Sequence, residues 1–275
     1  MIRLAGMLIG MLLVLQTSGQ VDTVTIRSAA MQKDIRCVVI RPSLRKSELS
    51  NGFPVVYLLH GYSGRYDNWI KKVPMLVTYA EDYRVMIVCP DGDYSSWYFD
   101  SPVDSSMRYE TYIAREVPAY IDAHYRTIPT RQGRAITGLS MGGHGALFLA
   151  WRHPGVFGAC GSMSGGVDLS GLKKKYDIAQ RLGDTIRHST NWKNYSVINL
   201  VEKIKPDSLA MLIDCGLDDF FFADNQALHQ KLVAMKVPHD YIERPGKHNW
   251  EYWETAVPFQ LLFFSRFFQK AMTRN

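Results

Sequence analysis

Short, continuous apolar runs constrain the fold of this chain more than any other feature of its sequence. The clearest are Phe53–Leu59, Val85–Cys89 and Leu209–Ile213, and each is followed within three residues by Gly or Pro. Apolar runs of this length without polar alternation are typical of strands that are buried on both faces, as in a parallel sheet. The chain therefore favours a sheet that is covered by helices on both sides.

Other segments alternate between strand and helix patterns in the same way. Val21–Ile26 and Ile35–Ile40 alternate with period two and predict an N-terminal antiparallel hairpin. Further strands are predicted at Arg134–Thr137, Phe157–Met163 and His239–Glu243, and helices at Tyr109–Tyr125, Gly145–Arg152, Asn225–Met235 and Ala256–Lys270. Strands that alternate with helices predict an α/β fold with a doubly wound, mostly parallel sheet. Residues 165–206 show no clear period and are predicted to be a small cap insertion over the site.

The first nineteen residues are predicted to be a secretory signal peptide. Arg3 is the only charged residue before Asp22, Leu4–Leu15 is apolar, and small residues follow as far as Gly19. An N-terminal anchor or a buried first helix is the alternative, but the run is shorter than the roughly 20 residues that span a bilayer. We therefore expect export to the periplasm or the extracellular space, with a single domain over residues 20–275.

Charge and cysteine usage argue against several classes of partner and site. The net charge is +6, but the basic residues are scattered, and the longest basic run is Lys173–Lys175. Nucleic-acid binders concentrate such charge, so no nucleic-acid partner is expected. Cys37, Cys89, Cys160 and Cys215 form no C-x-x-C pair, which argues against a zinc site. We expect free buried thiols, no metal and no cofactor.

Gly138-Leu139-Ser140-Met141-Gly142 matches the G-x-S-x-G pattern of a nucleophile elbow. A strand with β-branched residues leads into the pattern, and a helix rich in small residues leads out of it. In this geometry a tight turn projects the Ser140 hydroxyl above the sheet, and a larger side chain at either glycine would collide in the turn. The alternative is a Gly-rich turn in which Ser140 caps the helix.

A serine nucleophile needs a histidine base and an acid that orients the base. In this architecture the order along the chain is Ser, then Asp or Glu, then His. His248 follows the last predicted strand, and Asp218 and Asp219 follow the strand before it. All of them fall at the same edge of the sheet as Ser140, where open α/β sheets place their sites. Spacing alone does not choose between Asp218 and Asp219.

The same chemistry needs two backbone N–H groups that stabilise an oxyanion. One is expected from Met141, directly after the serine, and the other from the loop that follows an early strand. His60-Gly61-Tyr62-Ser63-Gly64 is that loop, and the N–H of Tyr62 is the candidate. The alternative is an ordinary glycine-rich turn, and we expect His60 itself to have a structural role.

Taken together, the motifs of this chain resemble those of the esterase D-type α/β-hydrolases. This group includes S-formylglutathione hydrolases, feruloyl and acetylxylan esterases, tributyrin esterases and mycolyltransferases. The matching segments are His60–Gly64 with Asn68-Trp69, Pro90–Gly92, Ser96–Ser101, Gly138–Gly143, Phe157-Gly158 and His248-x-Trp250-x-x-Trp253. The resemblance covers nearly all of the chain after the predicted signal peptide. It implies the α/β-hydrolase fold and a serine carboxylesterase with a catalytic triad.

The resemblance also implies individual roles. The nucleophile and base correspond to Ser140 and His248, and the oxyanion donors to Tyr62 and Met141. In the family the acid usually lies three residues after the glycine that closes its strand, which corresponds to Asp219. Ester hydrolysis through these groups implies no metal and no organic cofactor.

The substrate is predicted only as a class. S-formylglutathione hydrolases usually carry Ser-Gly-Leu-Thr-Cys where this chain has His60–Gly64. Together with the export signal, this favours a hydrolase of acetyl or feruloyl esters, including esters of carbohydrates. Trp69, Trp97 and Trp250 are expected to contact the substrate, because aromatic rings suit a sugar or a phenolic group. Acyl transfer to a sugar, thioester hydrolysis and a non-catalytic binding module remain the alternatives.

Overall fold

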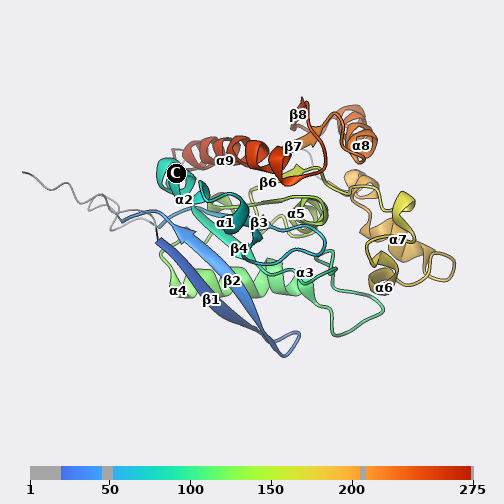
Figure 1. The fold of residues 1–275 in the computed structure, drawn as a ribbon, viewed down its shortest axis with the longest axis horizontal. Helices are drawn as coiled ribbons and strands as arrows, with labels where there is room; N and C mark the ends of the chain where they lie inside the picture. The colour runs from blue at the N-terminus through green and yellow to red at the C-terminus, as the bar shows by residue number, and fades with distance from the viewer. Residues whose placement is uncertain (1–19, 45–51, 205–208, 274–275) are drawn as a thin grey trace, which may run out of the picture.

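A mixed sheet of eight strands forms the centre of the molecule (Figure 1). The computed structural model describes residues 20–44, 52–204 and 209–273. The strand order is β1-β2-β4-β3-β5-β6-β7-β8. The strands are β1 (Gln20–Ser28), β2 (Lys33–Arg41), β3 (Val55–Leu59), β4 (Met86–Pro90), β5 (Arg134–Gly138), β6 (Ala159–Met163), β7 (Ala210–Gly216) and β8 (Asp240–Arg244).

The direction of the strands follows the predicted pattern. β1 and β2 form an antiparallel hairpin, and β2 also pairs antiparallel with β4. Every neighbouring pair from β4 to β8 is parallel. The prediction of a doubly wound, mostly parallel α/β sheet with an N-terminal hairpin is therefore confirmed.

Helices cover both faces of the sheet because successive strand side chains point to opposite faces. In β3, Val55, Tyr57 and Leu59 join one core and Val56 and Leu58 join the other. The second core receives the helices α1 (Asn68–Lys72), α2 (Leu76–Tyr83) and α9 (Trp250–Met272), and the first receives α3 (Tyr109–Thr111), α4 (Val117–His124), α5 (Met141–Arg152) and α8 (Phe222–Ala234).

Two helices differ from the sequence prediction. The segment expected to be a helix over Tyr109–Tyr125 consists of α3 and α4 joined by a π-helical turn at Tyr112–Glu116. The C-terminal helix begins at Trp250 and not at Ala256, because the side chain of Asn249 caps it by accepting a hydrogen bond from the Tyr252 N–H. This earlier start carries Trp250 and Trp253 to the vicinity of His248.

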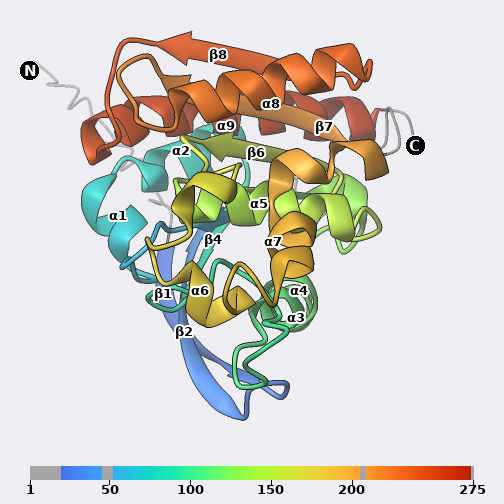
Figure 2. The same cartoon turned by 90° about the vertical axis from the view of Figure 1, so that its right-hand side faces the viewer.

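The aperiodic stretch after β6 contains only short helices in its described part. They include α6 (Ile178–Leu182) and α7 (Ser189–Tyr195), with 3₁₀ turns between and around them. Figure 1 shows α6 and α7 grouped at one end of the molecule, and Figure 2 looks at the molecule from that side. The predicted signal peptide, residues 1–19, lies outside the described residues.

Two further findings concern membranes and thiols. Among residues 20–44, 52–204 and 209–273, no helix is both long and apolar enough to cross a bilayer. Cys37, Cys89, Cys160 and Cys215 are all buried and carry free thiols.

Candidate active site

Ser140 lies on a sharp turn between β5 and α5. Its backbone has φ 55° and ψ −116°, a conformation that an L-residue adopts only when the surrounding structure holds it there. A Cβ atom on Gly142 would come within 2.5 Å of the His60 carbonyl oxygen, and one on Gly138 within 2.7 Å of the Gly142 backbone. Glycine is therefore required at both flanking positions, as the elbow pattern predicts.

Three side chains from separate loops form a continuous hydrogen-bond chain. His248 Nε2 is 2.9 Å from Ser140 Oγ, and His248 Nδ1 is 2.8 Å from one oxygen and 3.0 Å from the other oxygen of the Asp219 carboxylate. The Asp219 side chain is fully buried, whereas Asp218 is exposed to solvent. The structure thus brings Asp219 and not Asp218 against the histidine, which spacing alone did not decide.

Backbone contacts bring the acid loop and the histidine loop together. The Leu217 N–H donates to the Arg244 carbonyl at 2.8 Å, and the Asp218 N–H donates to the Gly246 carbonyl at 2.9 Å. A Cβ atom on Gly216 would lie 2.4 Å from the Gly246 carbonyl oxygen, so the two loops approach closely only because this residue is glycine. This contact fixes the distance between Asp219 and His248 before any ligand binds.

A second buried carboxylate nearby belongs to the core and not to the hydrogen-bond chain. Asp214 on β7 accepts hydrogen bonds from the Tyr252 hydroxyl and from the Arg244 guanidinium. Burial raises the pKa of Asp214 to about 6. Its oxygens are occupied by these two partners, so they do not compete with Asp219 for His248.

The loop after β3 lies directly beside the serine. A Cβ atom on Gly61 would lie 2.6 Å from the Leu139 side chain and 3.4 Å from the Ser140 Cβ. Among the described residues, the N–H of Tyr62 has no hydrogen-bond acceptor. Met141 is the first residue of α5, so its N–H has no carbonyl of the same helix to bind. Neither N–H group has an acceptor in the part of the chain that the structure describes, so both can bind an oxyanion.

His60 supports this loop from inside the protein. Its Nδ1–H donates to the Gly61 carbonyl at 2.8 Å, and its Nε2 accepts from the Gly92 N–H at 2.7 Å. Burial lowers the pKa of His60, which keeps the ring neutral and both contacts intact. The expected structural role of His60 is consistent with these two bonds.

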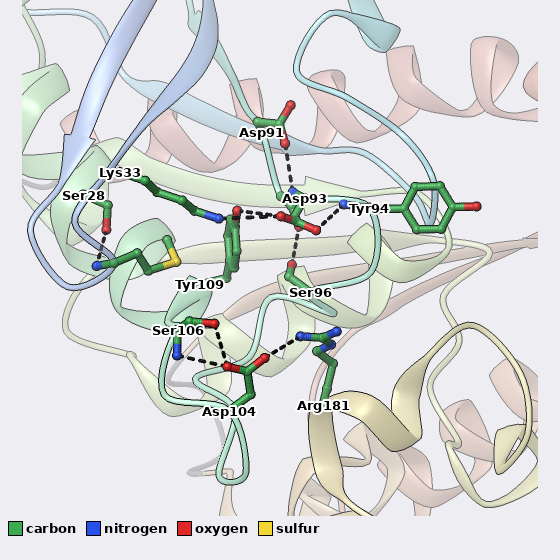
Figure 3. A network of polar contacts seen from close by, with 12 residues as sticks. Ser28, Lys33, Asp91, Asp93, Tyr94, Ser96, Asp104, Ser106, Tyr109 and Arg181 are labelled. Atoms are coloured by element: carbon green, nitrogen blue, oxygen red, sulfur yellow. Dashed lines mark hydrogen bonds and ion pairs between the residues drawn. The ribbon is translucent and has the colours of Figure 1, made fainter.

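A polar network holds the loop that follows β4 (Figure 3). Asp93 accepts from the Tyr94 N–H at 2.7 Å and from the Tyr109 hydroxyl at 3.3 Å, and it pairs with Lys33 at 3.6 Å. Arg181 of α6 reaches Asp104 at 3.1 Å, so the insertion is anchored to the same loop. The Tyr94 carbonyl in turn accepts a 2.7 Å bond from the Ser63 N–H.

A cavity of about 330 Å³ opens onto Ser140 and His248. Five aromatic side chains contribute to its wall, namely Tyr62, Tyr176, Phe220, Trp250 and Trp253. Phe220 is 61% exposed, and its ring centre lies 4.3 Å from that of His248. Three larger cavities elsewhere on the described residues, of about 620, 740 and 450 Å³, contain none of the residues of the hydrogen-bond chain.

The structure corrects two of the three predicted substrate contacts. Trp69 and Trp97 are each 1% exposed and do not line the cavity, whereas Trp250 does. The Trp69 indole N–H donates to the Leu59 carbonyl at 2.9 Å, so this residue fixes the end of β3. An aromatic residue near a site in the sequence is often part of the core, because a large ring gains most when it is buried.

Two residues of the cavity wall were missed at the sequence level. Tyr176 lies inside the aperiodic stretch 165–206, where no periodicity indicates the direction of its side chain. Phe220 follows Asp219 directly, and this position next to the acid was the available signal. Among the described residues, no group of three His, Cys, Asp or Glu side chains is arranged to hold a metal ion.

Comparison with known proteins assigns the family. A family described as "Putative esterase" matches residues 28–264. The chain belongs to this esterase family. An acetyl esterase of Caldicellulosiruptor saccharolyticus is 25% identical over 248 residues, which cover 84% of this chain and 92% of that protein. An S-formylglutathione hydrolase of Mus musculus is 28% identical over 204 residues, covering 66% of this chain and 70% of that protein.

The solved structures agree with the family assignment. The solved structure of a ferulic acid esterase is 30% identical to this chain and superposes with a TM-score of 0.76. The match covers 91% of this chain and 99% of that protein. The fold is therefore that of the α/β-hydrolases, and the protein is an ester-hydrolysing enzyme. The esterase D-type resemblance drawn from the motifs is confirmed.

Proposed function

We propose that this esterase is a serine carboxylic ester hydrolase with Ser140 as nucleophile, His248 as general base and Asp219 as the orienting acid. One observation carries the proposal, the hydrogen-bond chain from Asp219 through His248 to Ser140. The free N–H groups of Tyr62 and Met141 beside the serine complete the arrangement that acyl transfer requires.

The geometry supports a two-step mechanism. Ser140 Oγ attacks the ester carbonyl carbon while its proton passes to His248 Nε2, and the oxyanion is stabilised by the N–H groups of Tyr62 and Met141. The tetrahedral intermediate then collapses, and the proton on His248 leaves with the alcohol. Water then attacks the acyl-enzyme carbonyl while its proton passes to His248 Nε2, and the carboxylic acid leaves as that proton returns to Ser140 Oγ. Asp219 holds the Nδ1–H tautomer of His248, so that Nε2 faces the serine.

For the substrate, we propose a short acyl ester such as an acetyl ester, or a feruloyl ester, including such esters of carbohydrates. Relatives named acetyl esterase and ferulic acid esterase support this class. A cavity of about 330 Å³ lies at the small end of the range for ligand pockets, and its aromatic wall suits a phenolic ring or a sugar.

We also propose that the enzyme is exported to the periplasm or the extracellular space. The proposal depends on residues 1–19, with their single basic residue, apolar run and small residues. Expression of the full chain should yield a mature protein that begins near residue 20, as read by mass spectrometry of the intact protein. Retention of Met1 in the exported fraction would contradict signal-peptide cleavage.

The deciding experiment compares the protein with its Ser140→Ala variant on p-nitrophenyl acetate, butyrate and octanoate and on methyl ferulate. We expect kcat to fall by at least ~10⁴-fold, because the oxyanion site alone leaves little catalysis. A variant that keeps a tenth of the activity would contradict the nucleophile assignment. The ranking of the four esters defines the acyl pocket.

Thioester hydrolysis is a second candidate, because one relative is named S-formylglutathione hydrolase. S-formylglutathione is added to the same assay. Turnover of this thioester well above that of every oxygen ester would favour the second candidate.

A further inference from the structure

The turn at Tyr176–Asp177 connects the insertion to the site. Both residues have positive φ values, 55° and 54°, although neither is glycine. Such conformations cost of order 1–3 kcal/mol each and persist only where neighbouring contacts hold them. Two hydrogen bonds reach this turn from other loops, one to each residue.

The first bond comes from a residue that the sequence had suggested as a substrate contact. The Trp97 indole N–H donates to the Tyr176 carbonyl at 2.9 Å. Trp97 and Tyr98 also have positive φ values, 53° and 60°, and the Tyr98 hydroxyl donates to the His60 carbonyl at 2.9 Å. Two adjacent strained residues in the loop after β4 thus connect the insertion to the start of the oxyanion loop.

The second bond reaches the oxyanion loop itself. The Tyr62 hydroxyl donates to Asp177 Oδ2 at 2.9 Å, and the Tyr62 ring packs edge-on against Tyr94 and Tyr176, with ring centres 4.9 and 5.3 Å away. Burial and the adjoining Asp177 carboxylate raise the pKa of Tyr62, so its hydroxyl remains a donor.

The bond from Tyr62 to Asp177 differs from the other contacts of the oxyanion loop, His60–Gly64. Backbone and imidazole contacts fix Gly61, Ser63 and Gly64, but the N–H of Tyr62 has no acceptor among the described residues. The side chain of Tyr62 is held by Asp177 at its far end. The Tyr62 N–H shares a peptide plane with the Gly61 carbonyl, which accepts from the His60 ring and from the Gly64 N–H. The bond to Asp177 holds the other end of the same residue, so the position of Tyr62 depends on the insertion as well as on its own loop.

We propose that Asp177 is a positioning residue that sets the oxyanion hole through its hydrogen bond to Tyr62. The inference rests on the proposed function of Ser140 and of the Tyr62 N–H. It also gives the insertion a role in specificity, since Tyr176 lines the cavity on the same turn. An acyl group that displaces Tyr176 moves Asp177 with it, so a poorly fitting acyl group lowers kcat and not only the affinity.

The test is a double-mutant cycle with Asp177→Ala, Tyr62→Phe and the double variant. Steady-state rates on p-nitrophenyl acetate are measured with the rate at which a fluorophosphonate labels Ser140, because the phosphoryl oxygen of this probe occupies the oxyanion site. Each single variant is expected to lose about tenfold in kcat and in labelling rate, with KM within twofold, which is below the 10²–10³-fold cost of deleting a donor. The double variant should be no slower than either single variant.

Three further variants control for folding and chemistry. Asp177→Asn keeps an acceptor oxygen and should retain activity within about threefold. Trp97→Phe removes the indole N–H on the other side of the turn, together with part of the buried ring, and we expect the same pattern of loss. Gln180→Ala removes a different bond to the Asp177 carboxylate, 3.2 Å long, and should leave kcat unchanged.

Each other outcome overturns the inference or the function on which it rests. A wild-type kcat and labelling rate in Asp177→Ala, or additive losses in the double variant, would overturn the positioning role. A change confined to KM that grows with acyl length would mean that the turn is only a wall of the pocket, which also overturns it. A wild-type protein that the probe does not label overturns the proposed function itself, and the inference with it.

Discussion

At the scale of single residues, the site depends on positions where no side chain fits. Gly142 is the second residue of α5, where alanine would ordinarily gain about 1 kcal/mol of helix propensity. A Cβ atom there would lie 2.5 and 2.7 Å from the backbone oxygens of His60 and Leu59. We expect Gly142→Ala to lower the free energy of unfolding by about 2 kcal/mol, because backbone atoms must shift.

Gly155 provides the matched control. A Cβ atom at Gly155 would meet nothing within 4 Å, so Gly155→Ala should change stability by less than about 0.5 kcal/mol. Urea unfolding of both variants measures the difference. The steric argument fails if Gly142→Ala is as stable as Gly155→Ala.

The two neighbouring aspartates allow a similarly matched test of the acid. Asp219→Asn keeps the size of the buried side chain but offers His248 an amide, which favours the wrong tautomer. We expect kcat to fall by about 10³–10⁴-fold. Asp218→Asn changes an exposed side chain and should leave kcat within about twofold. Equal losses in the two variants, or a loss confined to Asp218→Asn, would refute the assignment of Asp219.

The positions of site residues could be predicted from the sequence wherever a motif or the order of the strands fixes the local backbone. Ser140 follows from the elbow pattern, and His248 from the order of the strands. The choice between Asp218 and Asp219 was open, because the end of a strand does not determine which side chain of the following turn points inward. Trp97 was misplaced for a related reason, since a ring beside the site and a ring beneath it have the same sequence pattern.

At the scale of elements, α5 connects the nucleophile to the insertion through His144. The His144 Nε2–H donates to the Tyr195 carbonyl of α7 at 2.9 Å, and the buried Nδ1 has no partner among the described residues. Burial lowers the pKa of His144 from its ordinary 6.5 to about 3. The native protein therefore keeps this ring neutral over a pH range in which the unfolded chain protonates it.

This difference predicts acid instability with a definite sign. Between pH 6.5 and about 3 the unfolded state binds one more proton at His144 than the native state does. The stability that this residue contributes is complete above pH 6.5, and it is lost at up to about 1.4 kcal/mol per pH unit as the pH falls. In His144→Gln, whose amide N–H can still reach Tyr195, the unfolding free energy should depend less on pH between 6.5 and 4. Parallel pH profiles for the two proteins would contradict the prediction.

The sequence predicted the strands better than the ends of the helices. Buried strands stand out as apolar runs, whereas a helix end depends on a cap that is visible only when its side chain is placed. The cap of α9 is Asn249, seven residues before the predicted start at Ala256. The insertion had no periodicity to interpret, because its helices are short and hydrogen bonds to other loops, such as Trp97 to Tyr176 and Arg181 to Asp104, help to hold it.

At the scale of the whole molecule, the sheet separates two cores, and this separation determines the chemistry of the cysteines. Cys37 on β2 and Cys89 on β4 lie on adjacent strands and are offset by one residue, because Cys37 pairs with Pro90 and Val38 with Cys89. Side chains offset by one residue point to opposite faces. Cys37 accordingly belongs to one core and Cys89 to the other. These two thiols cannot form a disulfide without moving a strand.

The burial of the cysteines predicts how their thiols react. The thiolate is the reactive form, and burial raises the pKa of Cys89, of Cys215 and, to about 12, of Cys160. We expect the native protein to give no reaction with Ellman's reagent and to give four thiols once it is unfolded in guanidinium without reductant. Its melting temperature should be the same with and without dithiothreitol. Fewer than four thiols after unfolding would show that an exported form of the chain acquires a disulfide, which would require two of these strands to pack differently from the sheet in Figure 1.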